Sequence, residues 1–371
     1  MNMLNLPKKV YFKPGSMNVA LRELSEVYHL KRAFLVSDPV LYRSGAVRDI
    51  DDWLRKRGIR TAEFFSTGAP PSFAHIRSAL PKLLEFEPDV IVGIGGGSAM
   101  SAAKAMWALY ENPDLDLSAA AEQPERIRTG EKAKLALVAT SFAGGAQNSP
   151  FAVLQDDAGA LRVLRSFQLL PEISVTDARF TETLSPAQVK SCGLTALSLS
   201  VRAFADPGCN EYTEHLLREA AGLILKHLPG GEAGRPDALE HLHNAAALVG
   251  AACGNVLETL DPAPPLWLRR RTPTASASPS WPGTWASPTG RPCGPPVRPS
   301  AKHPSDAPPV RAWQGRAVFC LERAKSPRRL SQCVRRRGRS FDFGGVLRHR
   351  SGRPWGRPGS PRRRPPWSPR R

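Results

Sequence analysis

The segment from residue 89 to residue 113 constrains the fold of this 371-residue chain most strongly. Residues 89–94 form a short apolar run typical of a buried parallel strand, and Gly95, Gly96, Gly97 and Ser98 follow directly. Residues 99–110 are helix formers, which Asn112-Pro113 ends. Glycines between a strand and a helix allow the backbone to approach a phosphate, and the free N–H groups of the helix start favour an anion there. The alternative is a tight turn that binds nothing.

Segments of strand length and of helical periodicity alternate through the first half of the chain. This alternation predicts a mostly parallel sheet with helices on both faces. After residue 177 only helical spacing remains, and it predicts an all-helical second domain. The predicted strands are 33–37, 60–65, 89–94 and 135–140, and the predicted helices are 47–57, 75–86, 99–110, 185–204, 211–228 and 237–257.

Composition changes abruptly near Pro262. The 110 residues from there to the end carry 25 Lys+Arg and three acids, a net charge of +22, whereas residues 1–261 carry 27 and 30, a net charge of −3. The same segment holds 21 of the 36 prolines. Too little apolar surface remains to offset the entropy of ordering, so this segment is predicted to be disordered. The predicted division is therefore 1–180, 181–261 and 262–371.

Several classes of protein are excluded by composition. No run of about 18 apolar residues exists, so no membrane-spanning helix is predicted. Residues 1–10 lack the charged start, apolar run and cleavage site of a secretory leader. The six cysteines form no C-x-x-C pair, which argues against a zinc ribbon or a disulfide scaffold. A cytoplasmic location is expected.

Asp38 follows the first predicted strand of the alternating region. A dinucleotide-binding fold places an acid at such a strand end to bind the adenosine ribose hydroxyls. A capping aspartate is the equally weighted alternative, and the glycine turn in the same half of the chain favours ribose binding. Since an acid would repel a 2′-phosphate, NAD is favoured over NADP.

Three segments carry a resemblance to a known family. The sequences VYFKPGS at 10–16, PDVIVGIGGGS at 88–98 and AKAMW at 103–107 resemble iron-containing (group III) alcohol dehydrogenases. Residues 106–113 and 150–157 look most like the alcohol dehydrogenase half of bifunctional aldehyde-alcohol dehydrogenases. The resemblance covers about residues 8–260. It implies a dehydroquinate synthase-like fold, in which a Rossmann-like α/β domain and an all-helical domain enclose NAD and a divalent iron or zinc ion. The implied reaction interconverts a small alcohol and its aldehyde.

The resemblance transfers residue by residue to the cofactor site, with departures. Ser101 stands where the family has an aspartate, Phe142 where it has a small residue, and Gln147 where it has a glutamate. The predicted cofactor-binding residues are Asp38, Gly95, Gly96, Gly97, Ser98, Thr140 and Ser141.

The family's metal ligands are not matched by this sequence. Thr195 and Leu199 stand where the family places an aspartate and a histidine four residues apart, and the next histidine position falls at about Pro262, where the resemblance ends. His241 and His243 point to different sides of a helix, and both are predicted to be solvated surface residues. The sequence therefore predicts no metal site, names no catalytic residue and predicts impaired or absent dehydrogenase activity.

Besides an impaired dehydrogenase, two other classes of function stay open. One is a non-catalytic NAD-binding subunit that forms homo-oligomers or joins related dehydrogenases. A third reading is nucleic-acid binding through the basic segment, in which arginines contact phosphates while Trp355 and Trp367 stack on bases. Against it, Arg, Pro, Ser, Gly and Trp are what GC-rich DNA encodes out of frame. Only non-specific binding is expected there, and no membrane partner.

Overall fold

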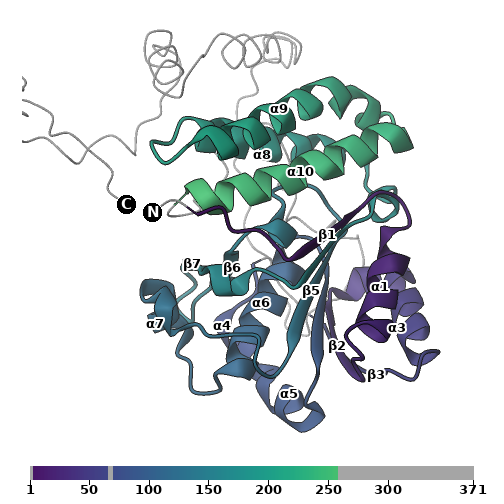
Figure 1. The fold of residues 1–371 in the computed structure, drawn as a ribbon, viewed down its shortest axis with the longest axis vertical. Coiled ribbons are helices and arrows are strands. Elements are labelled where there is room, and N and C mark those ends of the chain that lie inside the picture. Colours follow the sequence, from purple (N-terminus) through teal and green to yellow (C-terminus); the bar gives the residue numbers. More distant parts are fainter. Residues whose placement is uncertain (1–2, 66–69, 258–371) are drawn as a thin grey trace, which may run out of the picture.

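The computed structural model describes residues 3–65 and 70–257 (Figure 1). Six strands form one sheet in the order β1-β8-β5-β4-β2-β3, and every neighbouring pair is parallel. A separate antiparallel hairpin joins the remaining two strands. The sheet strands are β1 (Lys9–Phe12), β2 (Arg32–Ser37), β3 (Arg60–Phe65), β4 (Val90–Gly95), β5 (Lys134–Ala139) and β8 (Ile173–Thr176), and the hairpin strands are β6 (Phe151–Gln155) and β7 (Leu161–Arg165).

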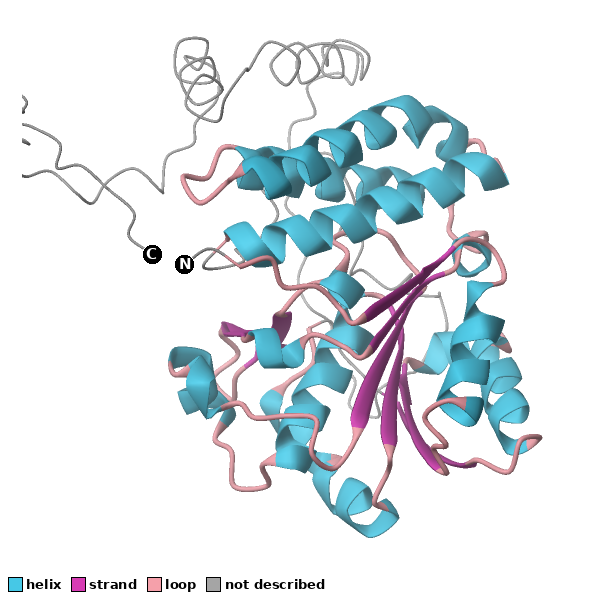
Figure 2. Ribbon diagram, in the orientation of Figure 1, coloured by secondary structure: helices cyan, strands magenta, loops and turns pink. Residues whose placement is uncertain are grey.

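Helices cover both faces of the sheet (Figure 2). Along β2, Ala33 and Leu35 pack into one core while Phe34 and Val36 pack into the other, as the two-residue period of a strand requires. One face is covered by α1 (Ser16–Glu26) and α3 (Ala46–Arg55), and the other by α4 (Phe73–Ser78), α5 (Leu80–Phe86), α6 (Gly97–Glu111) and α7 (Leu117–Glu122).

Three long helices form a further layer beyond the carboxyl ends of the strands (Figure 1). They are α8 (Pro186–Phe204), α9 (Glu211–Glu232) and α10 (Pro236–Val256). The side chain of Ser185 accepts a hydrogen bond from the N–H of Gln188, whose side chain returns to the Ser185 backbone, so a capping box fixes the start of α8. Phe142 and Phe151 join the apolar core of these helices and connect it to the sheet.

The parallel Rossmann-like arrangement predicted from the sequence is confirmed, with differences in detail. The predicted helix at 75–86 is two helices, since the chain breaks at Ala79 and restarts with Pro81 in the first turn of α5. The sequence analysis did not predict β1, whose four residues are mostly exposed, or the short β8. The predicted segment boundaries remain predictions, and residues 262–371 lie outside the described residues.

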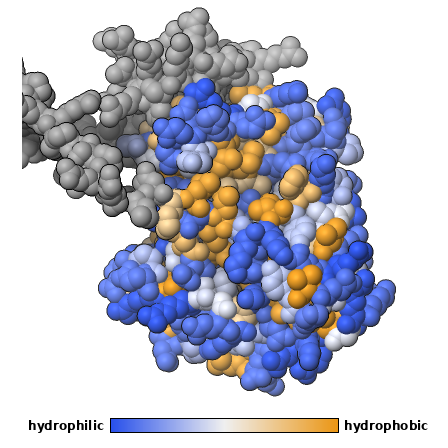
Figure 3. Space-filling view, in the orientation of Figure 1, coloured by the Kyte–Doolittle hydropathy of each residue, from blue (hydrophilic) through white to orange (hydrophobic). Residues whose placement is uncertain are grey.

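The surface that carries the N-terminal segment and β1 is apolar in part (Figure 3). Met3, Leu4, Leu6, Val10 and Phe12 are all exposed there. Among the described residues, no helix combines the length and apolarity that crossing a bilayer would require.

Candidate dinucleotide-binding site

The candidate site lies where the strand order reverses. From β2 the chain adds β3 on one side and then returns to place β4 on the other side of β2. In open parallel sheets, ligands bind outside the carboxyl ends of the strands at such a point. Asp38 follows β2, the glycine turn follows β4, and Thr140 and Ser141 follow β5, which pairs with β4. The fold therefore brings all the predicted cofactor-binding residues to three adjacent strand ends.

The glycine turn is tightly packed on one side and open on the other. Gly95 has a φ of +154°, and a Cβ atom there would lie 2.6 Å from the Cβ of Ala99. A Cβ on Gly96 would lie 3.1 Å from Ser141 Oγ, whereas one on Gly97 would meet nothing within 4 Å. No side chain of the described residues caps α6, so its first N–H groups have no side-chain acceptor. This geometry fits a phosphate group.

Asp38 is a capping residue, and its position stays compatible with the ribose-binding role that the sequence left open. Its Oδ1 accepts hydrogen bonds from the N–H groups of Val40 at 2.8 Å and Leu41 at 2.9 Å, so it caps the short helix α2 (Pro39–Arg43). Its Oδ2 is directed toward the glycine turn, 3.8 Å from a Cβ built on Gly95. The capping bonds engage Oδ1, while Oδ2 lies beside the glycine turn, and ribose binding by Oδ2 remains a prediction.

Thr140 and Ser141 follow β5 and lie next to the glycine turn. The N–H of Thr140 donates to the carbonyl oxygen of Gly95 at 3.0 Å, which extends the β4–β5 pairing by one step. Thr140 is buried and Ser141 is half-buried, with its hydroxyl next to Gly96. A hydroxyl at this place is suited to donate a hydrogen bond to a phosphate oxygen.

A buried carboxylate that the sequence analysis missed lies at the end of β8. Asp177 is 0% exposed, and its Oδ2 accepts from the N–H groups of Gly15 at 3.0 Å and Met17 at 3.2 Å. Arg179 donates to both oxygens. Despite burial, these bonds hold the pKa of Asp177 below its ordinary value. The carboxylate thus anchors the turn between β1 and α1 to β8.

One of the two histidines predicted to be solvated is buried. His241 is exposed and stacks on His227 with ring centroids 4.0 Å apart, whereas His243 is 0% exposed. Neither ring nitrogen of His243 has a hydrogen-bond partner among the described residues, and Phe142 is its aromatic neighbour at 6.5 Å. Burial lowers the pKa of His243 to about 4. The two-residue offset places the rings on opposite sides of α10, as predicted, but the prediction of surface exposure was wrong for His243.

The residues at the family's metal positions do not fit a metal ion. The hydroxyl of Thr195 donates to the carbonyl oxygen of Ser191 at 2.8 Å, and Leu199 packs with Cδ1 3.3 Å from a Cβ built on Gly144. Gln147 is buried and donates to Thr176 Oγ1 at 3.3 Å. Over the described ranges, no group of three or more His, Cys, Asp or Glu side chains converges. Pro262 lies outside these ranges.

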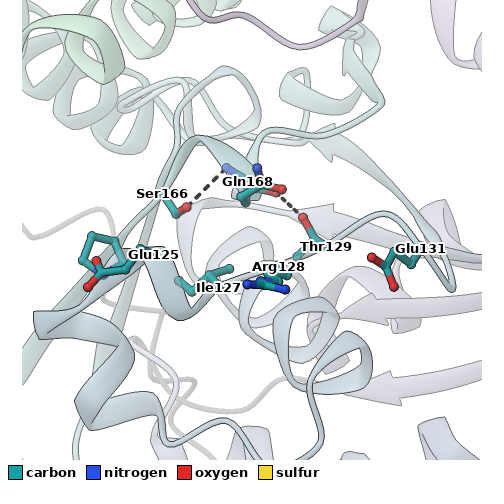
Figure 4. Close-up of a pocket in the computed structure, with 8 residues that line it drawn as sticks. Glu125, Ile127, Arg128, Thr129, Glu131, Ser166 and Gln168 are labelled. Atoms are coloured by element: carbon teal, nitrogen blue, oxygen red, sulfur yellow. Dashed lines mark hydrogen bonds between the residues drawn. The ribbon is translucent and has the colours of Figure 1, made fainter.

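A surface cavity of about 430 Å³ lies away from this site (Figure 4). It is lined by residues that precede β5 and β8, so it lies at the amino edge of the sheet. Thr129 Oγ1 donates to the carbonyl oxygen of Gln168 at 2.6 Å and closes one side. Since the glycine turn lies at the carboxyl edge, this cavity belongs to a different part of the molecule.

Comparison with known proteins gives matches to the part of the chain that contains the candidate site. The family model of iron-containing alcohol dehydrogenases matches residues 7–178. Aldehyde-alcohol dehydrogenase 2 of Entamoeba histolytica is 33% identical over 267 residues, which are 69% of this chain and 30% of that protein. This chain therefore spans about 30% of the length of that relative.

Solved structures share the fold. An iron-containing alcohol dehydrogenase from Thermococcus thioreducens superposes with a TM-score of 0.63 at 23% identity, over 69% of this chain and 68% of that one. A sulfoacetaldehyde reductase from Bifidobacterium kashiwanohense, solved in complex with NAD+, superposes with a TM-score of 0.61 at 19% identity, over 68% of this chain and 66% of that one.

The parallel sheet with a glycine turn at its switch point defines an α/β protein of the Rossmann-like class. Within that class, the resemblance of this chain to the iron-containing alcohol dehydrogenases, and to the alcohol dehydrogenase part of the bifunctional aldehyde-alcohol dehydrogenases, is confirmed as a partial match.

Proposed function

We propose that this chain binds NAD at the glycine turn and lacks the metal-assisted interconversion of alcohol and aldehyde. The observation that carries the proposal is the open helix start after Gly96, which no side chain of the described residues caps, with Ser141 Oγ next to Gly96 and Asp38 Oδ2 next to Gly95. The helix start and the hydroxyl suit the pyrophosphate, and the carboxylate suits the adenosine ribose. The NAD+ bound to the sulfoacetaldehyde reductase, which shares the fold, supports the choice of cofactor.

The proposed lack of metal-assisted activity rests on the residues that stand at the family's metal-ligand positions. Oxidation of an alcohol by hydride transfer requires that its hydroxyl lose a proton, and a metal ion or a general base normally assists that loss. Thr195 and Leu199 provide neither, and the amide of Gln147 replaces a carboxylate. We therefore expect NAD binding without appreciable turnover of small alcohols or aldehydes.

Calorimetric titration of the full chain with NAD and NADP tests the cofactor assignment. NAD should bind and raise the free energy of unfolding by about 1.4 kcal/mol at ten times Kd, and NADP should bind more weakly. Asp38→Asn should weaken NAD binding, whereas Asp52→Asn, an exposed aspartate on α3, should not. Absence of any heat or melting shift at saturating NAD would remove the assignment.

Metal analysis tests the proposed lack of metal binding and of alcohol oxidation. After dialysis against Fe²⁺ or Zn²⁺, the protein should hold well under one equivalent and should not reduce NAD in the presence of a small alcohol. Stoichiometric metal together with NAD-linked alcohol oxidation would refute the proposal.

We also propose that copies of the chain associate. The support is the edge strand β1, which has one neighbour in the sheet of described residues and exposes Val10 and Phe12. An unpaired edge with apolar side chains is a template for pairing. Light scattering should show a dimer or larger species that Phe12→Lys converts to monomer. A wild-type monomer at micromolar concentration would refute association.

A further inference from the structure

Lys104 is a fully buried ammonium group whose donors are all used. The residue is 0% exposed in the middle of α6. Its Nζ donates to three backbone carbonyl oxygens: Ala146 at 2.8 Å, Ser149 at 2.5 Å and Phe151 at 2.9 Å. A lysine ammonium carries three N–H groups, so three carbonyls saturate it.

These contacts are costly to form, which argues that they matter for the conformation of the chain. Taking an ammonium out of water is expensive, and a well-packed apolar side chain in its place would often be no less stable. Among the described residues, the hydrogen-bond partners of Lys104 are backbone carbonyl dipoles rather than a carboxylate. What Lys104 provides over an apolar residue is a defined position for those three carbonyls.

The segment that Lys104 holds is the one that begins with Thr140 and Ser141. Between β5 and β6 this segment contains only the short 3₁₀ helix η2 (Ala146–Asn148). Lys104 holds it from the side of α6. On the other side α10 holds it, since Asn148 Nδ2 donates to the carbonyl oxygen of Ala247 at 3.2 Å. The segment is thus clamped between the helix that starts at the glycine turn and the helical layer.

We propose that Lys104 is a positioning residue for the cofactor, which sets the separation between the glycine turn at the start of α6 and Thr140-Ser141. Lys104 acts through the backbone of 146–151 and does not touch the cofactor. This inference rests on the proposed NAD binding. It goes beyond that proposal because it assigns the spacing of the two halves of the site to a residue away from them.

Lys104→Met tests the inference, because it keeps an unbranched side chain and removes the three donors. The matched control is Met106→Ala, which damages an equally buried position of the same helix but removes no hydrogen-bond donor. Calorimetry at a temperature where all variants are folded should show NAD binding weakened tenfold or more in Lys104→Met and less than twofold in Met106→Ala. Lys104→Gln, which retains two N–H donors, should be intermediate. Equal effects of Lys104→Met and the control would overturn the inference.

The pH profile distinguishes positioning from general loss of structure. Burial lowers the pKa of Lys104 to about 7, and no charged side chain of the described residues contributes to that shift. Above this pH the neutral amine has two N–H groups for three carbonyls. NAD affinity of the wild type should therefore fall between pH 6 and pH 8.5, while that of Lys104→Met should not change. A flat wild-type profile would overturn the inference.

Hydrogen exchange separates failure of this inference from failure of NAD binding. Without any ligand, amides of segment 140–151 should exchange at least tenfold faster in Lys104→Met than in Met106→Ala. If the wild type binds no NAD but the exchange rates differ in this way, the proposed function fails, while the role of Lys104 in holding segment 140–151 is supported. If the exchange rates agree, the positioning role is refuted whether or not NAD binds.

Discussion

Acid should destabilise this protein through His243 specifically. The ring is fully buried in α10 without a hydrogen-bond partner among the described residues, and burial lowers its pKa from 6.5 to about 4. The folded protein therefore resists protonation that the unfolded chain accepts. Because the folded-state pKa is lowered, the unfolded state binds more protons between pH 6.5 and pH 4, and stability falls as pH falls through that window.

The magnitude follows from the two pKa values. Each pH unit between them costs about 1.4 kcal/mol, so the complete effect is about 3 kcal/mol below pH 4. Many domains have a free energy of unfolding of about 5–15 kcal/mol. The titration of this one ring is thus a large fraction of the total stability.

Urea unfolding of the full chain at a series of pH values between 7.5 and 4.5 measures the effect. The His243→Leu variant should lose about 2–3 kcal/mol less than the wild type over this range. Carboxylates and the other histidines titrate equally in both proteins and cancel. The control is His241→Gln, which changes an exposed ring two residues away and should retain the wild-type slope. Parallel pH profiles for wild type and His243→Leu would refute the reasoning.

Two further predictions concern stability alone. Gly250→Ala should lower the free energy of unfolding by more than about 3 kcal/mol, because a Cβ would lie 1.9 Å from the carbonyl oxygen of Gly145. Gly222→Ala should instead stabilise α9 by about 0.5–1 kcal/mol, because a Cβ there meets nothing within 4 Å. Chemical denaturation of both variants checks the pair, and equal effects would contradict it. Asp177→Asn should cost about 2–4 kcal/mol, because it removes a charged acceptor from two backbone N–H groups and from Arg179. Thermal unfolding measures this loss, and an unchanged midpoint would count against the anchoring role.

Local features of the chain could be predicted because nearby residues determine them. Segments of strand length predicted β2, β3, β4 and β5, and the glycines after residue 94 predicted the turn that opens α6. The helix predicted at 185–204 agrees with α8, because a capping serine and a first-turn proline fix its start within one turn. The broken helix at Ala79 shows the limit of periodicity, because the apolar spacing continues across the break.

Pairs of distant residues could not be predicted in the same way. In the sequence, nothing distinguishes Lys104 from the other residues of its helix. Its burial depends on backbone carbonyls more than 40 positions later in the chain. In the sequence, Asp177 is an acid at the end of a strand. Only the pairing of β8 with β1 brings the N–H group of Gly15 to its carboxylate. The two-residue offset separates His241 from His243, but which ring is buried depends on how α10 packs against the sheet.

The sequence by itself therefore determined the Rossmann-like class, the glycine turn, the family resemblance and the mismatch at Thr195 and Leu199, since each depends on residue type or on spacing within one element. The tertiary structure decided that the strand order reverses between β3 and β4, on either side of β2, and that Asp38, the glycine turn and Thr140 meet there. It also decided which side chains are buried beside them. The physical reason is that strand pairing and helix packing join segments that are far apart in the chain, and local periodicity is the same for every order in which those segments could be assembled.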